Sequence, residues 1–495
     1  MKKRIHEVEL FMKHPHEVQK DVLLKLISTA RHTEFGKKHG FDAIKNAEEF
    51  RNRIPLANYE TLFPYIERLM KGEQKLLWPS DIKWFAKSSG TTGARSKFIP
   101  VSQEALDDCH YKGGKDMISI YVNNYPDTKV FAGKTLAIGG SHQINTLDEN
   151  SNSRYGDVSA VIMKNLPFWA QMTRTPSLET ALMENWDEKI KKMAKETANE
   201  NVTNITGIPT YTIVLIEKIL QDTGAANILE VWPNLELFVH GAVAFTPYRE
   251  LFKKLIPSPE MRYLETYNAT EGFFGIQDQP HSDEMLLMLD YGVFYEFIPM
   301  EFYKQENPKV VGLHEVEIGK SYALVISTNA GLWRYVIGDT VKFTSLLPYR
   351  IKISGRTKHF INAFGEEVVI ENAEKAVAKA CEVTNATIDN FTAGPQYYGE
   401  SNKGCHEWII EFSKEPNDLE EFAKILDNTL REINSDYDAK RYNDLALKAP
   451  IIHQAPKGTF YQWMKKRGKL GGQNKVPRLA NNRDYLDEIL EMMRR

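Results

Sequence analysis

The feature that most constrains the fold is a change of hydrophobic pattern near Trp84. Before it, apolar residues recur at steps of three and four, which predicts helix through the first thirty residues and over 43–53 and 60–72. Beyond it, short apolar runs alternate with longer helical segments. This alternation predicts an α/β fold with a largely parallel sheet. The expected strands are 135–138, 235–239 and 323–328, and the expected helices are 178–196, 212–222 and 248–255.

A second change of pattern predicts a domain boundary near Ser354-Gly355-Arg356. The segment that follows has the length of one ordinary domain. It predicts a smaller α+β unit with helices over 371–381 and 419–434, strands over 389–393 and 408–412, and an exposed loop over 468–477. We therefore expect a large N-terminal α/β domain, residues 1–354, and a mobile α+β lid domain, residues 355–495.

Composition excludes several classes of protein. The 495 residues exceed a single ordinary core, and 42% hydrophobic with 26% charged residues is typical of a globular chain. A net charge of -3 provides no whole-chain basis for binding nucleic acid or an anionic membrane. The three cysteines, Cys109, Cys381 and Cys405, are far apart and fit no metal-ligand spacing. These cysteines indicate a reduced, cytoplasmic setting. No uncharged apolar stretch approaches the ~20 residues of a membrane helix, which disfavours membrane insertion.

The most informative motif is a loop rich in hydroxyl groups, Ser88-Ser89-Gly90-Thr91-Thr92-Gly93, followed by Ala94-Arg95-Ser96-Lys97. Glycines let backbone N–H groups approach an anion closely, hydroxyls add neutral donors, and the two cations add charge. It is not the P-loop pattern, which requires Gly-Lys-Ser/Thr at its end. A polyphosphate site and a plain solvated loop fit the loop alone equally well.

Two acidic motifs lie downstream. In Tyr267-Asn268-Ala269-Thr270-Glu271-Gly272 the ring suits an adenine, Thr270 a phosphate oxygen, and Glu271 a Mg²⁺ ion, which prefers oxygen ligands. In Trp333-Arg334-Tyr335-Val336-Ile337-Gly338-Asp339 the carboxylate follows a glycine at a predicted strand end and suits ribose hydroxyls. Taken alone, the first motif is better explained by a core tyrosine and a capping or solvated Glu271, and the second by a plain Gly-Asp turn.

Two further segments, 207–210 and 240–243, each follow a predicted strand. Their glycines suit a backbone that lies close to a ligand, and they suit ordinary α/β turns equally well. His240 in the second segment is expected to be a satisfied structural residue.

In this order, the motifs resemble those of the adenylate-forming acyl and aryl acid ligases. The chain more closely resembles the auxin-responsive Gretchen Hagen acyl-acid amidosynthetase family over nearly its whole length. The further segments that carry the resemblance are Thr33-Glu34-Phe35-Gly36, Tyr59-Glu60, Pro64-Tyr65-Ile66, Gly72-Glu73, Leu77-Trp78, Gly458-Thr459-Phe460 and 472–478.

The resemblance implies an ATP- and Mg²⁺-dependent enzyme that forms an acyl-AMP and passes the acyl group to an amino acid. Lys97 and Lys475 are the implied catalytic residues, the latter reaching the reacting carboxylate when the lid closes. Glu271 is the implied Mg²⁺ ligand. The implied nucleotide-binding residues are Ser88, Ser89, Gly90, Thr91, Thr92, Tyr267, Asn268, Thr270, Asp339 and Arg356.

The chain departs from the amidosynthetase pattern in two places. Gly93 lies one residue earlier than usual, which leaves open which backbone amides hold the phosphates. Thr270-Glu271 replaces the Ser-Glu of the hormone-conjugating enzymes, so the resemblance does not identify the carboxylic acid.

Two alternatives remain open at the level of sequence. One is an acyl-CoA ligase that uses the same adenylate, and the other is a nucleotide-binding scaffold without turnover. The presence of Lys97, Glu271, Asp339 and Lys475 argues against the scaffold. The oligomeric state is not determined.

Overall fold

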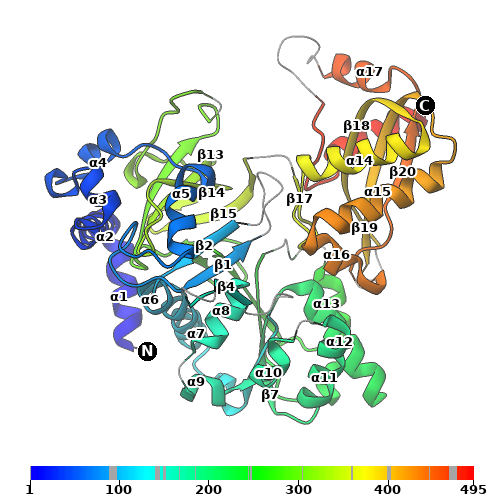
Figure 1. Cartoon of the computed structure of the whole chain (residues 1–495). Coiled ribbons are helices and arrows are strands. Elements are labelled where there is room, and N and C mark those ends of the chain that lie inside the picture. Colours follow the sequence, from blue (N-terminus) through cyan, green and yellow to red (C-terminus); the bar gives the residue numbers. More distant parts are fainter. Residues whose placement is uncertain are drawn as a thin grey trace.

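A computed structural model describes the fold (Figure 1). It covers residues 2–494 except 89–96, 140–144, 149–151, 167, 184, 243–244, 246–247, 304, 358–359, 399–402, 445 and 468–475. Among these described residues, no helix is long and apolar enough to cross a membrane.

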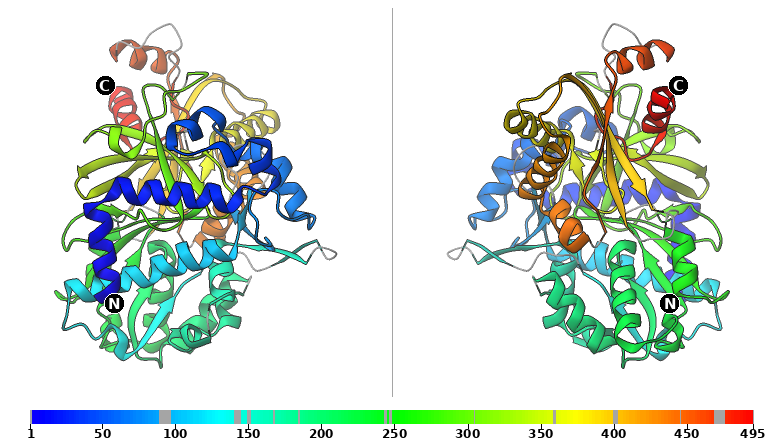
Figure 2. Two further views of the ribbon diagram at one scale, coloured as in Figure 1. Left: turned by 90° about the vertical axis from the view of Figure 1, so that its left-hand side faces the viewer. Right: turned by 90° about the vertical axis from the view of Figure 1, so that its right-hand side faces the viewer.

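The N-terminal region is helical, as predicted, but it forms two helices, α1 (Lys2–Lys13) and α2 (Pro15–Ala30). The break occurs at His14 because Pro15 has no N–H to continue the preceding helix and is suited to the first turn of the next. Gln19 Nε2 donates to the carbonyls of Leu289 and Val293, which fastens α2 across one face of the large sheet (Figure 2). Three shorter helices follow: α3 (Glu34–Lys38), α4 (Ala47–Arg53) and α5 (Tyr59–Met70).

The large sheet has eleven strands in the order β12-β13-β14-β15-β11-β10-β9-β8-β7-β3-β6. Strands β6, β3, β7, β8 and β9 are parallel, but every pair from β9 to β12 is antiparallel. The expectation of a largely parallel sheet is therefore correct for one half only. The bounds are β3 (Lys134–Ala137), β6 (Arg174–Thr175), β7 (Val202–Thr206), β8 (Leu237–His240), β9 (Arg262–Ala269), β10 (Gly272–Ile276), β11 (Met285–Leu287), β12 (Val293–Pro299), β13 (Ser321–Thr328), β14 (Tyr335–Leu346) and β15 (Tyr349–Arg356).

Helices join the parallel strands, because a parallel connection must cross over the sheet. The predicted helix over 178–196 is in fact two helices, α10 (Leu178–Ala181) and α11 (Trp186–Thr197), and Asn185 caps the second by accepting the Glu188 N–H. α12 (Pro209–Thr223) and α13 (Arg249–Leu255) follow β7 and β8. A further helical segment comprises α6 (Gln103–Ala105), the π-helical turn η2 (Leu106–Tyr111) and α7 (Lys112–Asn124).

A four-stranded sheet carries the ends of the hydroxyl-rich loop. It contains β1 (Trp84–Ser88), β2 (Lys97–Val101), β4 (Asn145–Asp148) and β5 (Ser153–Gly156). β1 and β2 are antiparallel, with Ser88 opposite Lys97. The chain therefore enters and leaves the loop at neighbouring points of one sheet.

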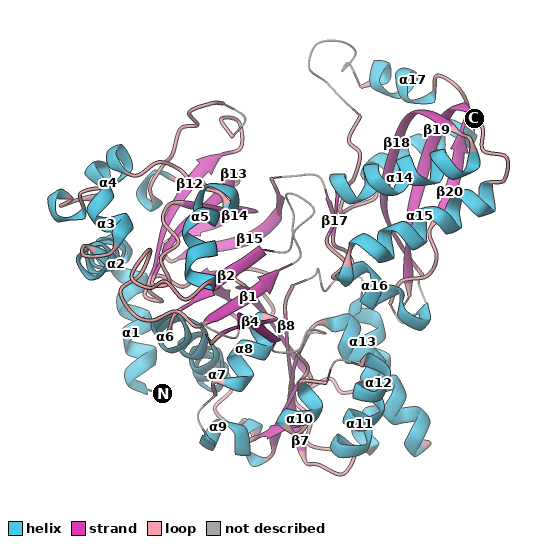
Figure 3. Ribbon diagram, in the orientation of Figure 1, coloured by secondary structure: helices cyan, strands magenta, loops and turns pink. Residues whose placement is uncertain are grey.

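The C-terminal region is the predicted α+β unit. Strands β18 (Thr387–Tyr397), β19 (Gly404–Lys414) and β20 (Ile451–Ala455) form a sheet on which α14 (Ile370–Thr384) and α15 (Leu419–Ile433) pack side by side (Figure 3). The remaining elements are β16 (Phe360–Ile361), β17 (Val368–Val369), α16 (Ser435–Arg441), α17 (Thr459–Lys466) and α18 (Asp484–Arg494). The boundary between residues 354 and 355 stays a prediction, and strand β15 runs across it.

Candidate active site

A cavity of about 1340 Å³ lies at the carboxyl ends of β7, β8 and β9, and residues from the C-terminal region close part of it. This edge of a parallel sheet is where α/β proteins commonly bind ligands. The two glycine-containing segments that follow predicted strands, 207–210 and 240–243, line this cavity. The lining residues are Gly207, Ile208, His240, Gly241 and Ala242. Both interpretations of these segments therefore apply: they are turns that follow strands, and their backbone lies beside the cavity.

The two acidic motifs meet on one wall of this cavity. Tyr267 Oη donates to Asp339 Oδ2 at 2.6 Å, which joins β9 to β14. Asp339 lies inside β14 opposite Arg356 of β15, so the prediction that it follows a strand end was wrong. The position still suits ribose, because one carboxylate oxygen is held by Tyr267 and the residue lines the cavity.

Thr270 and Glu271 form the turn between β9 and β10. Thr270 Oγ1 donates to Glu271 Oε2 at 2.7 Å. Burial raises the pKa of the Glu271 carboxyl, the charge of Lys97 acts in the opposite direction, and Asp339 adds to the increase. Three predicted residues from distant parts of the chain thus lie within electrostatic range of one another.

Lys97 begins β2 with its side chain largely buried, and its ammonium lies 5.9 Å from the centre of the Tyr59 ring. Tyr59 Oη also accepts the Phe98 N–H at 2.9 Å. The Tyr59 side chain therefore supports both the backbone and the cation at the end of the hydroxyl-rich loop.

Asn268 is exposed and lines the cavity, and its side chain lies near that of the buried His110. His110 lies in the π-helical turn η2, and burial lowers its pKa to about 4. It is a neutral imidazole near pH 7. Sequence reasoning missed His110, and no local pattern marks it.

The remaining predicted site residues are only partly described. Ser88 ends β1 opposite Lys97, and Arg356 ends β15 opposite Asp339. Ser89, Gly90, Thr91, Thr92 and Lys475 lie outside the described residues.

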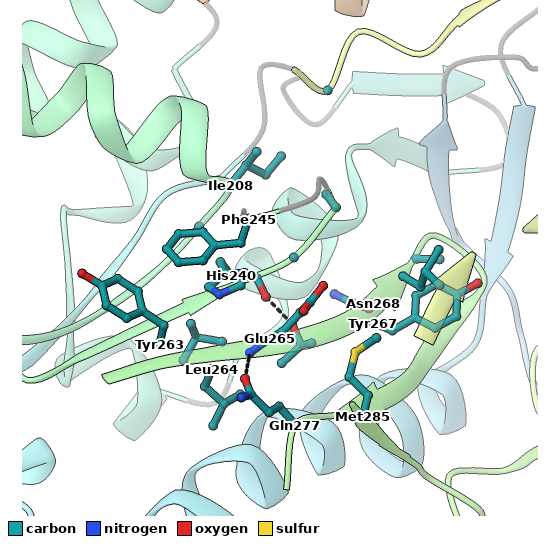
Figure 4. A pocket seen from close by; sticks show the side chains of 18 of the residues that line it. Ile208, His240, Phe245, Tyr263, Leu264, Glu265, Tyr267, Asn268, Gln277 and Met285 are labelled. Atoms are coloured by element: carbon teal, nitrogen blue, oxygen red, sulfur yellow. Dashed lines mark hydrogen bonds between the residues drawn. The ribbon is translucent and has the colours of Figure 1, made fainter. Parts of the chain in front are cut away.

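Another wall of the cavity carries Glu265 and His240, which are Cα partners on β9 and β8 (Figure 4). Burial and the nearby Asp283 raise the pKa of Glu265, while burial and Arg249 lower that of His240 to about 3. The His240 ring stacks on Phe245 at 4.1 Å between ring centroids. Its Nδ1 has no hydrogen-bond partner within the described chain, so the expectation of a fully satisfied histidine was wrong.

The residues around Glu271 suit Mg²⁺ only in part. No group of three or more His, Cys, Asp or Glu side chains that could hold a metal occurs among the described residues. Mg²⁺ usually keeps several waters and uses one or two carboxylates together with substrate phosphates. The single carboxylate of Glu271 fits this pattern of ligands, although burial, which raises its pKa, works against the ionised form that a metal requires.

Comparison with known proteins agrees with this geometry. Three family models match the chain in order: the GH3 family N-terminal domain over residues 4–261, the central domain over 286–356 and the C-terminal domain over 371–484. A curated relative, the indole-3-acetic acid-amido synthetase GH3.4 of Arabidopsis thaliana, is 23% identical over 97% of this chain and 92% of its own length.

Two solved structures share the fold. The GH3.15 acyl acid amido synthetase superposes with a TM-score of 0.62 at 18% identity, covering 100% of this chain and 96% of that one. A 2-hydroxyisobutyryl-CoA ligase with 2-HIB-AMP and CoA superposes with a TM-score of 0.56 at 12% identity, covering 97% and 93%. The fold is thus that of adenylate-forming ligases, and the three family models, which together match most of its length, show that the chain belongs to the GH3 family.

Proposed function

We propose that this chain is an acyl-acid amido synthetase, which uses ATP to activate a carboxylic acid as an acyl-adenylate and transfers the acyl group to an amino acid. The observation that carries the proposal is the convergence of Lys97, Glu271 and Asp339 on one cavity. The activity named for GH3 relatives adds support, because the family's domains match most of this chain.

In the first step, a carboxylate oxygen of the acid attacks the α-phosphorus of ATP, and the bond from that phosphorus to the bridging oxygen of pyrophosphate breaks. Asp339, held by Tyr267, binds the ribose hydroxyls, and Thr270 donates to the α-phosphate. Lys97 offsets the negative charge that grows on the pyrophosphate. Glu271 holds Mg²⁺, which when bound supplies further positive charge to the phosphates.

In the second step, the amine of the acceptor attacks the acyl carbon, the bond to AMP breaks, and the amine loses a proton. We assign the C-terminal residues that line the cavity to this second step. Lys475 acts in the first step, when the lid domain occupies a different position. No residue of the chain forms a covalent bond with the acyl group.

Pyrophosphate exchange over a panel of carboxylic acids tests the first step. We expect exchange of labelled pyrophosphate into ATP that depends on the acid. Mass analysis of products with separate pools of amino acids and CoA tests the acceptor. A thioester as the sole product would support the CoA alternative, and the absence of exchange with every acid would contradict adenylation.

Asp339→Ala should weaken ATP binding by about 10- to 100-fold, because a hydrogen bond to a charged group contributes about 1.5–3 kcal/mol. Tyr267→Phe is the matched variant, since it removes only the hydroxyl that donates to Asp339. We expect a smaller loss in that variant. Calorimetric titration with a non-hydrolysable ATP analogue measures both, and unchanged affinity in Asp339→Ala would exclude the ribose role.

We also propose that the enzyme works in the reducing environment of the cytoplasm. Cys109, Cys381 and Cys405 are all free, and Cys109 and Cys405 are buried. Disulfides are rare in that compartment. Cell fractionation followed by immunodetection tests this location.

A further inference from the structure

Lys440 is a buried lysine on the C-terminal side of the cavity. It lies on α16, its exposed fraction is 2%, and it lines the cavity. Its Nζ lies 3.6 Å from the centre of the Tyr211 ring, which belongs to the first turn of α12 in the N-terminal region. The side chain therefore spans the two parts of the molecule at the point where they face each other across the cavity.

The ammonium has little to balance its charge. Among the described residues, the ammonium of Lys440 contacts the ring of Tyr211. It forms no ion pair with a carboxylate and no hydrogen bond to an acceptor there. Lys440 Nζ is not among the fully buried, unpaired polar atoms of the described residues, so the ammonium faces the cavity, where an anionic ligand can pair with it. Two carboxylates also line the cavity, Asp436 and Glu367, and each has an interaction of its own.

The start of a neighbouring helix also favours an anion beside the ammonium. α12 begins at Pro209, and its N-cap residue, Ile208, provides no side-chain capping hydrogen bond. The first turn of a helix carries partial positive charge and orients N–H groups towards an anion. Gly365 gives the Lys440 chain its room, because a Cβ at that position would lie 3.0 Å from Lys440 Cε and 3.3 Å from Nζ.

We infer that Lys440, at the start of α12, binds the carboxylate of the amino acid that accepts the acyl group. This inference rests on the proposed function and adds to it a rule for the acceptor, which must be an amine that carries an anionic group. The nucleotide phosphates have their own cation in Lys97, on strand β2 at the end of the hydroxyl-rich loop. An amino acid supplies the amine that attacks the acyl carbon and also a carboxylate that can pair with the Lys440 ammonium.

The test compares amino acids with the corresponding amino-acid amides, in which a neutral carboxamide replaces the carboxylate. We expect the wild-type enzyme to prefer the amino acid by about 10- to 100-fold in kcat/KM, as one hydrogen bond to a charged group predicts. Lys440→Met should remove that preference by raising KM for the amino acid, with amide formation falling relative to pyrophosphate exchange. Lys440→Arg should keep most of the preference, because the cation remains.

Lys448 provides the matched control. It lies in the same region over the ring of Tyr398, at 4.8 Å from the ring centroid, and is exposed outside the cavity. Lys448→Met should behave as wild type. A further arm offers CoA as the acceptor, and a selective loss of thioester formation in Lys440→Met would overturn the inference.

Two other outcomes would also overturn it. One is a wild-type enzyme that uses amides as well as amino acids, and the other is a Lys440→Met enzyme that loses activity equally with both acceptors. If Lys440→Met does not fold, loss of the preference in Lys440→Arg, or its absence in the wild-type enzyme, would still overturn the inference. Failure of the proposed function looks different, because pyrophosphate exchange would then be absent in the wild-type enzyme.

Discussion

Lys97→Met should lower acid-dependent pyrophosphate exchange by about 10²- to 10³-fold, the usual cost of removing one preorganised charge-stabilising group. Lys97 is largely buried, it lines the cavity, and it lies in range of the Glu271 carboxyl. Its ammonium is held above the Tyr59 ring before any substrate binds. This preorganisation lets its charge act on the departing pyrophosphate without reorganising the site.

The same substitution should also change the pH dependence of exchange. Burial raises the pKa of Glu271, and Lys97 opposes that effect, so removing Lys97 raises this pKa further. A carboxyl with a higher pKa stays protonated up to a higher pH, and only the ionised form binds Mg²⁺. The acid side of the pH–rate profile should therefore move to higher pH in Lys97→Met.

Lys87→Met is the control for this prediction. Lys87 lines the same cavity from β1, and its ammonium lies 6.0 Å from the centre of the Tyr155 ring. We expect only a small change in rate and no shift in the profile. Comparable losses in the Lys87 and Lys97 variants, or an unshifted profile in Lys97→Met, would contradict the role given to Lys97.

Arg334→Met should destabilise the protein by about 3 kcal/mol, the low end of the range for breaking a buried ion pair. Arg334 Nε donates to Glu296 Oε2 at 2.9 Å, and its Nη1 donates to the carbonyl of Ile54 at 2.7 Å. Glu296 has an exposed fraction of 1% and would keep Arg51 as a partner, at 3.2 Å. We take the low end because that second partner remains.

Chemical denaturation followed by tryptophan fluorescence measures this loss, since the neighbouring Trp333 is fully buried. The double variant Glu296→Gln with Arg334→Met should recover part of the stability, because it removes the buried charge. Lys320→Met, which breaks an exposed pair with Glu317, should leave the midpoint unchanged. If Arg334→Met unfolds at the same denaturant concentration as wild type, the ion pair between Arg334 and Glu296 does not stabilise the fold.

Arg334 also illustrates how a motif differs from a site. It lies in the same motif as Asp339, yet its side chain faces Glu296 and the end of α4. Its backbone is left-handed, with φ of 43°. The sequence predicted that this segment matters, but not which of its residues faces the cavity and which holds the fold.

Helices and strands were predicted correctly where the apolar residues recur with a regular period. The expected helix over 419–434 appears as α15, and the expected strand over 323–328 appears within β13. The pairing of strands did not follow, because periodicity states that a segment is extended and not which neighbour it meets. The antiparallel half of the large sheet was therefore missed.

The sequence by itself identified the functional groups of the site: a hydroxyl-rich loop with Lys97, a Thr-Glu turn, and an Asp after a glycine. Their order along the chain indicates an adenylating enzyme. The tertiary structure alone decided which groups meet. Tyr267 donates a hydrogen bond to Asp339, and the ammonium of Lys440 lies over the ring of Tyr211. These contacts join residues far apart in the chain, and they depend on strand order and lid position. Local patterns carry no information about either, because they record only how a residue relates to its near neighbours.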